Sequence, residues 1–153
     1  MLLSGLRDDV RAGCTIAATL PSRATAGVEC QPTGGAAEQV GAYLFKTDEA
    51  MLSAYFARMA AEGVKPQRGS CPTSAGDGIY VPTPGDDAAG PARIGCFVNE
   101  FGISNYRITY PDAHVYVGVL GRDRDMDVLG DWIWRGNQDQ PGSPTIWRDP
   151  STP

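Results

Sequence analysis

Cysteine is the residue type whose number and spacing most clearly indicate chemistry in this sequence. The four cysteines are Cys14, Cys30, Cys71 and Cys96. A structural zinc site needs four clustered ligands, usually supplied as close pairs on turns, and no two of these cysteines have CxxC spacing. The even number favours two disulfide bonds, with four reduced and buried thiols as the alternative.

Three pairings of the four cysteines are possible. We favour Cys14 with Cys30 and Cys71 with Cys96, because each bond then closes a modest loop within one stretch of local structure. Both loops are rich in glycine, proline and alanine, so the unfolded chain has much entropy to lose. Each bond would stabilise the fold by roughly 3 kcal/mol.

No set of residues indicates catalysis or a bound cofactor. A hydrolase triad needs a histidine beside a nucleophile, and the single histidine, His114, follows Pro-Asp-Ala at the start of a predicted strand, which is typical of a surface side chain. The patterns GxSxG, GxxxxGK[ST] and GxGxxG do not occur. Glycosidase chemistry needs two facing carboxylates, and with 18 acidic residues the sequence leaves that reaction open.

The acidic run Asp123, Asp125 and Asp127 is similar to the start of a calcium-binding loop. However, the loop position that demands glycine is Val128, and the position of the bidentate acid is Trp134. We therefore interpret the run as the start of a helix, where carboxylates complement the helix dipole, and predict no metal site.

Aromatic residues near the end of the chain suggest a binding surface. All three tryptophans lie in the last 22 residues, and tyrosines occupy the strands predicted before them. We interpret Trp132 as a core residue. Such aromatic side chains can form a stacking platform for a ligand, although packing in the core is the alternative. The candidate ligand or partner surface comprises Trp134, Trp147, Tyr106, Tyr110 and Arg107.

Periodicity predicts both helices and strands. A short amphipathic helix begins near Leu2 and ends before Gly13, and further helices are predicted over residues 48–62 and 125–135. Turn residues dominate between positions 66 and 91, so we expect an irregular segment there that is held through Cys71. Strands are predicted over residues 24–31, 39–46, 92–99, 103–110 and 114–120.

These elements predict an α+β fold, with a mostly antiparallel sheet of about five strands covered by two to three helices and stapled by two disulfides. At 153 residues the chain has the length of one domain. We place that domain at residues 2–135 and expect residues 136–153 to form a polar, proline-rich tail.

Charge and the cysteines limit the partners and the location. The net charge of −5 would be repelled by a phosphate backbone, which argues against a nucleic-acid partner. The N-terminus lacks the pattern of a secretory signal, and no apolar stretch approaches 18 residues. We expect an extracellular or cell-surface domain whose targeting signal or membrane anchor lies outside this sequence.

Several motifs together resemble a known family. They are LLSGLRDDVRAGC, a strand that ends VEC, YLFKTDEAMLSAYF, GSCP, ARIGCFV and the final DWIW, and they cover about residues 2–134. The chain resembles an extracytoplasmic module that follows the membrane span of actinobacterial-type receptor serine/threonine kinases and related membrane-anchored proteins. The resemblance implies a sensor or adhesion-like role, cysteines bridged in the favoured order, and no catalytic residue.

The chain also departs from that family. An isoleucine-tryptophan-threonine strand is replaced by Tyr106-Arg107-Ile108-Thr109, and the long tail through Trp147 is additional. We therefore expect a non-catalytic sensor domain of a membrane-anchored protein that binds a small ligand or a protein partner. The alternatives are an assembly subunit that forms homo-oligomers through residues 136–153 and, third, a carbohydrate-active enzyme.

Overall fold

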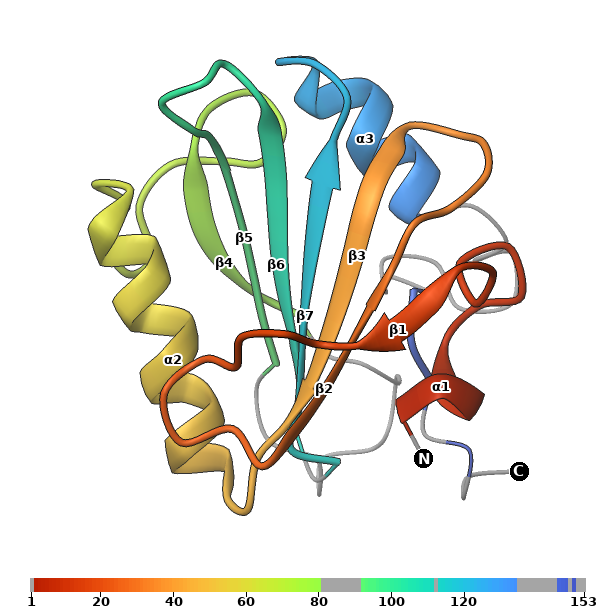
Figure 1. The fold of residues 1–153 in the computed structure, drawn as a ribbon. Helices are drawn as coiled ribbons and strands as arrows, with labels where there is room; N and C mark the ends of the chain where they lie inside the picture. Colours follow the sequence, from red (N-terminus) through yellow and green to blue (C-terminus); the bar gives the residue numbers. More distant parts are fainter. Residues whose placement is uncertain (1, 81–91, 112, 135–145, 149, 151–153) are drawn as a thin grey trace.

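The computed structural model describes residues 2–80, 92–111, 113–134, 146–148 and 150. Seven strands form one antiparallel sheet in the order β1-β2-β3-β7-β6-β5-β4 (Figure 1). The strands are β1 (Cys14–Ile16), β2 (Ala26–Cys30), β3 (Ala37–Leu44), β4 (Gly76–Tyr80), β5 (Ala92–Val98), β6 (Ser104–Tyr110) and β7 (Val115–Gly121). The helices are α1 (Leu2–Gly5), α2 (Asp48–Ala61) and α3 (Met126–Ile133).

The predicted α+β class and the antiparallel sheet are confirmed, but the number of strands is wrong. The five predicted strands correspond to β2, β3, β5, β6 and β7, and two short strands are added at the edges of the sheet. β1 has three residues, and β4 begins Gly-Asp-Gly inside the segment predicted to be irregular. Neither β1 nor β4 shows alternating apolar residues. Each is extended because it pairs with a neighbouring strand, β1 with β2 and β4 with β5.

Both predicted disulfides are present, and each one fastens an edge of the sheet. Cys14 and Cys30 lie directly opposite each other on β1 and β2 and are bonded. Cys71 precedes β4 and is bonded to Cys96 on β5. The covalent bonds therefore hold the two strands that the apolar pattern alone would not hold.

The helix predicted from Leu2 to before Gly13 is wrong in its length. α1 ends at Gly5, and Leu6 instead forms an isolated antiparallel bridge with Trp147. Leu6 and Val10 are nevertheless buried. The spacing of these apolar residues reflects their contact with the core, and a chain without helical structure can make the same contact.

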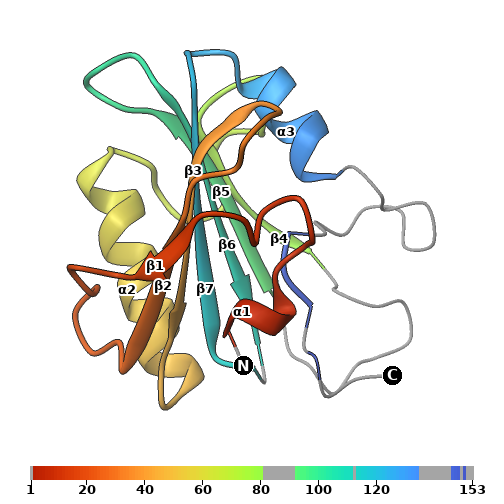
Figure 2. The ribbon, with the colours of Figure 1, turned by 45° about the vertical axis from the view of Figure 1, so that its right-hand side comes forward.

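The sheet is covered on both faces and has one apolar core on each. Figure 2 shows α2 on one face and α1 and α3 on the other. The α2 core consists of Phe45, Ala50, Met51, Tyr55, Met59, Val64, Phe97 and Tyr116. The α3 core is larger and includes Leu6, Val40, Ile108, Val117, Val119, Leu129, Trp132, Ile133, Ile146 and Trp147. Successive strand residues serve opposite cores because their side chains alternate across the sheet.

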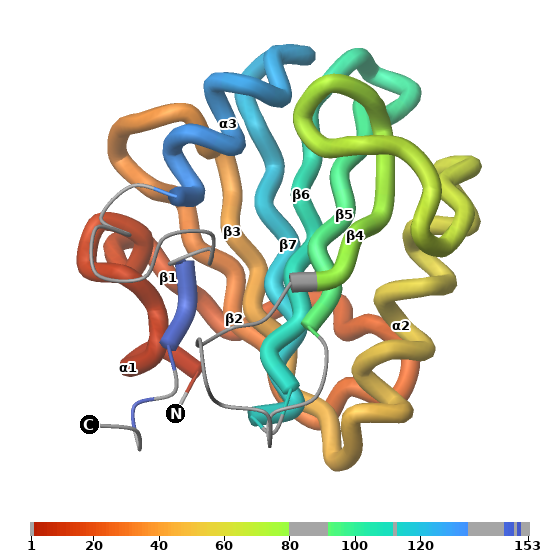
Figure 3. Tube along the Cα trace, turned by 180° about the vertical axis from the view of Figure 1, so that it is seen from behind, coloured from red at the N-terminus to blue at the C-terminus, as the bar shows by residue number. Residues whose placement is uncertain are grey.

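Residues near the C-terminus are part of the α3 core. The side chain of Trp147 is 3% exposed, and its indole N–H donates to the carbonyl of Leu2 over 3.1 Å. Ile146 is fully buried, and the amide of Arg148 donates to the carbonyl of Gly5. Figure 3 shows the short blue segment near the C-terminus, residues 146–148, beside α1. Most of the predicted tail, residues 135–145, 149 and 151–153, lies outside the described residues, so the predicted domain boundary at residue 135 stays a prediction.

The burial of Trp147 predicts its effect on stability. The substitution Trp147→Ala removes a buried indole and its hydrogen bond, so we expect the free energy of unfolding to fall by about 3–5 kcal/mol. The control Phe101→Ala removes a side chain that is 78% exposed and should change it by less than about 0.5 kcal/mol. Urea denaturation measures both, and equal effects would contradict the described packing of the C-terminal residues.

Candidate functional site

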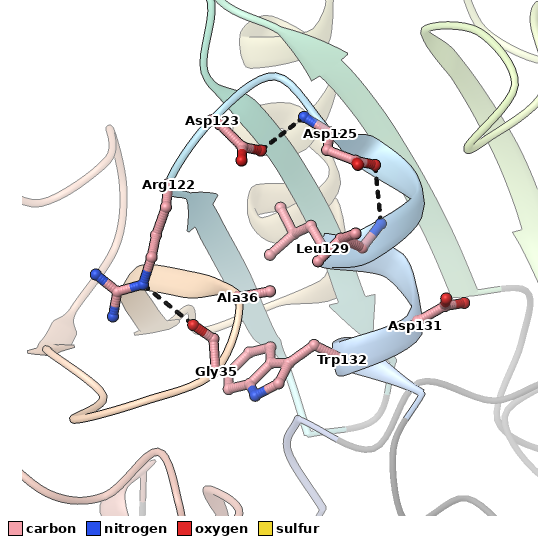
Figure 4. Close-up of a pocket in the computed structure, with 9 residues that line it drawn as sticks. Gly35, Ala36, Arg122, Asp123, Asp125, Leu129, Asp131 and Trp132 are labelled. Atoms are coloured by element: carbon pink, nitrogen blue, oxygen red, sulfur yellow. Dashed lines mark hydrogen bonds between the residues drawn. The ribbon is translucent and has the colours of Figure 1, made fainter.

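An open cleft lies between α3 and the turn that joins β2 to β3 (Figure 4). Its volume is about 670 Å³. The walls come from the turn before β3, the residues after β7, and one side of α3. The lining residues are Gly35, Ala36, Arg122, Asp123, Asp125, Val128, Leu129, Asp131 and Trp132. This is the candidate site, because small-molecule sites are typically concave spaces of roughly 300–1,000 Å³.

Arg122 holds the turn that forms one wall of the cleft. Its Nε donates to the carbonyl of Gly35 over 3.1 Å, and its Nη1 lies 2.5 Å from Oε2 of Glu38 at the start of β3. Its Nη2 donates to the carbonyl of Pro32. The guanidinium is thus used to fix the turn against the end of β7.

The acidic run forms the start of α3, as the sequence predicted. Asp125 caps the helix, because its Oδ1 accepts from the amide of Val128 over 3.1 Å. Asp123 Oδ1 accepts from the amide of Asp125 over 2.9 Å. Figure 4 shows both hydrogen bonds at the rim of the cleft. These bonds position the two carboxylates, and each bond uses one carboxylate oxygen.

Trp132 lines the cleft from the last turn of α3. The residue is only 3% exposed, as expected of a core residue. The Arg7 guanidinium lies 4.4 Å from the centre of its ring and also donates to its carbonyl. The indole nitrogen lies beside Gly35, where an added Cβ would come within 2.3 Å of it. Among the described residues the indole N–H has no hydrogen-bond partner.

The five residues predicted to form a ligand surface do not come together. The rings of Tyr106 and Trp134 meet edge to face at 6.1 Å, and those of Tyr110 and Trp147 are 5.4 Å apart. All four pack in or against the α3 core. The amide of Trp147 donates to the Tyr110 hydroxyl, so this contact is part of the packing that holds the C-terminal residues. The alternative reading, packing in the core, therefore describes these aromatics.

Arg107 lies on the opposite face of the sheet, because it directly follows Tyr106 along β6. Its Nη2 donates to Asn105 Oδ1 over 3.1 Å, and its Nη1 lies 3.4 Å from the Tyr116 hydroxyl. The guanidinium rests on Gly118, where a Cβ would come within 2.6 Å of it. Arg107 therefore covers the backbone of β7 at Gly118, and it does not line the cleft.

His114 pairs with Asp48, away from the cleft, and the described acidic residues form no metal-binding group. The half-exposed His114 ring places Nδ1 2.8 Å from Asp48 Oδ1, and this contact joins the start of β7 to the start of α2. No group of three or more histidine, cysteine, aspartate or glutamate side chains there could hold a metal ion.

A buried polar network was missed by the sequence analysis. Asp77 on β4 is 4% exposed and accepts hydrogen bonds from the Tyr55 hydroxyl, the Gln67 amide and the Arg93 guanidinium. The network joins β4 to α2 and to β5. The Gly-Asp-Gly sequence around Asp77 gave no signal for it, because such a sequence is typical of an exposed turn.

The comparisons with known proteins identified no relative. No protein-family model matches the sequence, and the searches of curated proteins and of solved structures found no match. The site is therefore interpreted from its own geometry.

The contact between Gly35 and Trp132 predicts a difference between two neighbouring glycines. Gly35 has a φ of +78° and faces the indole, so Gly35→Ala should lower the free energy of unfolding by about 2 kcal/mol or more. Gly34→Ala meets nothing within 4 Å and should leave stability within about 0.5 kcal/mol of the original. Thermal denaturation compares the two variants. If Gly35→Ala is as stable as the original protein, the described position of the turn against Trp132 is wrong.

The tyrosines predict a loss of stability at alkaline pH. Burial, and secondly the Glu29 carboxylate, raise the pKa of Tyr43 to about 12. Burial also raises the pKa values of Tyr55, Tyr106 and Tyr110. An unfolded tyrosine ionises near pH 10, so the free energy of unfolding should fall as the pH rises from about 10 to 12. Urea denaturation across this range, with Tyr43→Phe as a less sensitive variant, measures the effect; an unchanged stability up to pH 12 would contradict it.

Proposed function

We propose that this chain is a non-catalytic binding domain that works outside the cytoplasm as part of a membrane-anchored protein. The observation that carries the proposal is the cleft of about 670 Å³ beside α3. Its volume fits a small ligand, and its walls combine apolar and charged side chains, as small-molecule sites do.

The two disulfides support the proposed location. Disulfides are typical of proteins from oxidising compartments and rare in the cytosol. Both bonds here fasten edge strands of the sheet, which gives them a structural role. Among the helices of the described residues, none is long and apolar enough to cross a membrane.

The walls of the cleft also support binding in preference to self-association. Arg122 and the cap of α3 hold the walls in place, and a preformed site loses little entropy when a ligand binds. An arm that clasps another subunit would most simply use Trp147, yet this indole is buried in its own chain. The sensor role and the link to receptor kinases derive from the sequence resemblance alone and are part of the proposal.

A ligand screen tests the proposal. A mixed library of cationic, neutral and anionic fragments is added to the isotope-labelled protein, and backbone amide shifts are followed by NMR. We expect some fragments to shift residues of α3 and of the turn around Gly35. The substitution Val128→Trp fills the cleft from an exposed position. It should lower the affinity of these fragments by roughly tenfold or more.

The control is Ile79→Trp, which adds the same indole at an exposed position on β4 that does not line the cleft. It should leave fragment binding unchanged. Absence of any fragment that shifts the cleft, or equal binding to the Val128→Trp variant, would rule out the cleft as a binding site.

A further inference from the structure

We infer that the face of the sheet that carries α2 binds a small zwitterion, such as an amino acid, with its ammonium group at Glu29 and its carboxylate at Arg107. This site is separate from the cleft, which lies beside α3 on the other face. The inference goes beyond the proposed function and does not depend on it. It is carried by three observations: two unpaired charges of opposite sign, their position on one row of the sheet, and the glycines between them.

Two charged side chains are partly buried and lack a countercharge. In the described parts of the chain, every other aspartate, glutamate, lysine or arginine that is not exposed lies within ion-pair distance of a partner, as Asp77 does of Arg93. Glu29 and Arg107 are the exceptions, because neither forms an ion pair there, with each other or with another residue. A partly buried charge without compensation is costly, and a ligand that supplies both countercharges would remove that cost.

The guanidinium of Arg107 is held in place but is incompletely hydrogen bonded. Its Nη2 donates to Asn105 Oδ1, and the Asn105 amide is itself fixed by a bond to the carbonyl of Ile103. Its Nη1 lies 3.4 Å from the Tyr116 hydroxyl, and its buried Nε has no hydrogen-bond partner. Both partners are uncharged, and a guanidinium has five N–H donors, so both Nη atoms keep a donor for a carboxylate.

The carboxylate of Glu29 also keeps most of its hydrogen-bonding capacity. Its one contact among the described residues is Oε1 with the Tyr43 hydroxyl, at 3.4 Å, which is long for a bond between two oxygens. Burial and Glu29 raise the pKa of Tyr43, and the charge of Arg107 acts on it in the opposite direction. The Tyr43 hydroxyl is therefore close to both charges, and the remaining lone pairs of Glu29 can accept hydrogen bonds from an ammonium group.

The two charges lie on one row of residues across the neighbouring strands β2, β3, β7 and β6. Glu29 is opposite Gly41, and Arg107 is opposite Gly118. The two glycines are opposite each other, and directly opposite residues project from the same face. An added Cβ would come within 2.5 Å of the Tyr43 hydroxyl at Gly41 and within 2.6 Å of the Arg107 Nη1 at Gly118. The glycines therefore let these polar groups lie against the backbone between the two charged residues.

The pair of charges selects for a ligand that carries both signs. A ligand with only a carboxylate would be attracted by Arg107 and repelled by Glu29, and a simple amine would meet the reverse. A zwitterion is attracted at both ends, and because its net charge is zero, the net charge of −5 on the protein does not repel it. The rings of Tyr43 and Tyr116, 6.1 Å apart, can contact its hydrocarbon part. Most of α2 lies toward the β4 edge of this face, away from β2 and β3 (Figure 1).

Compounds with the same carbon chain test this inference at about pH 6.5, where amines and carboxylates are both ionised. They are 2-aminobutyrate and 4-aminobutyrate, which are zwitterions, butyrate, which is an anion, and butylamine, which is a cation. Titration of the isotope-labelled protein, followed by NMR, should give the tighter zwitterion an affinity roughly three- to tenfold above those of butyrate and butylamine. The shifted amides should lie in β3 and β7 around Gly41 and Gly118.

Two variants assign the two ends of the ligand. Glu29→Gln removes the negative charge and keeps the size of the side chain, so the advantage of the zwitterion over butyrate should disappear. Arg107→Gln removes the positive charge, so the advantage over butylamine should disappear. The controls Glu100→Gln and Arg68→Gln make the same changes at exposed positions and should alter each affinity less than about twofold. Far-ultraviolet circular dichroism confirms that all variants are folded.

The crossed pattern distinguishes binding from a structural role, because a variant that only loosens the sheet would weaken all of the compounds alike. The inference is overturned if neither zwitterion binds better than butyrate and butylamine, or if the advantage over butyrate survives in Glu29→Gln. Absence of binding by every compound overturns it as well. Binding in the cleft is measured separately, by shifts in α3 and around Gly35, so failure at this site leaves the proposed function standing.

Discussion

The structure depends on the alternation of side chains across a sheet that is covered on both faces. Each central strand must supply one core with every second residue and the other core with the residues between them. On β7, for example, Val115, Val117 and Val119 enter the α3 core, while Tyr116 enters the α2 core. A shift of register by one residue would exchange the two sets and break both cores. This constraint fixes the positions of the central strands.

The edges of the sheet are stabilised differently. β1 and β4 have few apolar side chains, and each is joined to its neighbour by a disulfide, with Asp77 adding a buried network on β4. Covalent closure is most useful where the unfolded chain is rich in glycine and proline, as it is around both bonds. The cysteines therefore stabilise the parts of the fold that apolar burial leaves weakest.

The cleft forms where three separate segments meet at one end of the sheet. The turn before β3, the residues that follow β7 and one side of α3 are brought together because β3 and β7 are neighbours in the sheet. Arg122 then ties the first two segments, and Arg7 and Gly35 fix the indole of Trp132 from two sides. Asp131 and Trp132 project from one helix turn that is positioned by this framework. The cleft is therefore a consequence of tertiary packing.

The sequence by itself determined the α+β class, the central strands, α2, the start of α3 and the pairing of the cysteines. These features follow from local periodicity, helix caps and short loop closure, which involve residues close in sequence. Only the tertiary structure decided the edge strands, the end of α1 at Gly5, the burial of Trp147 and the assembly of the cleft. Each of these depends on contacts that only the folded chain makes: β4 with β5, Leu6 with Trp147, and Arg122 with the turn at Gly35. The five residues of the candidate surface do not lie together for the same reason. A strand places Tyr106 and Arg107 on opposite faces of the sheet, and Trp147 is buried in the α3 core.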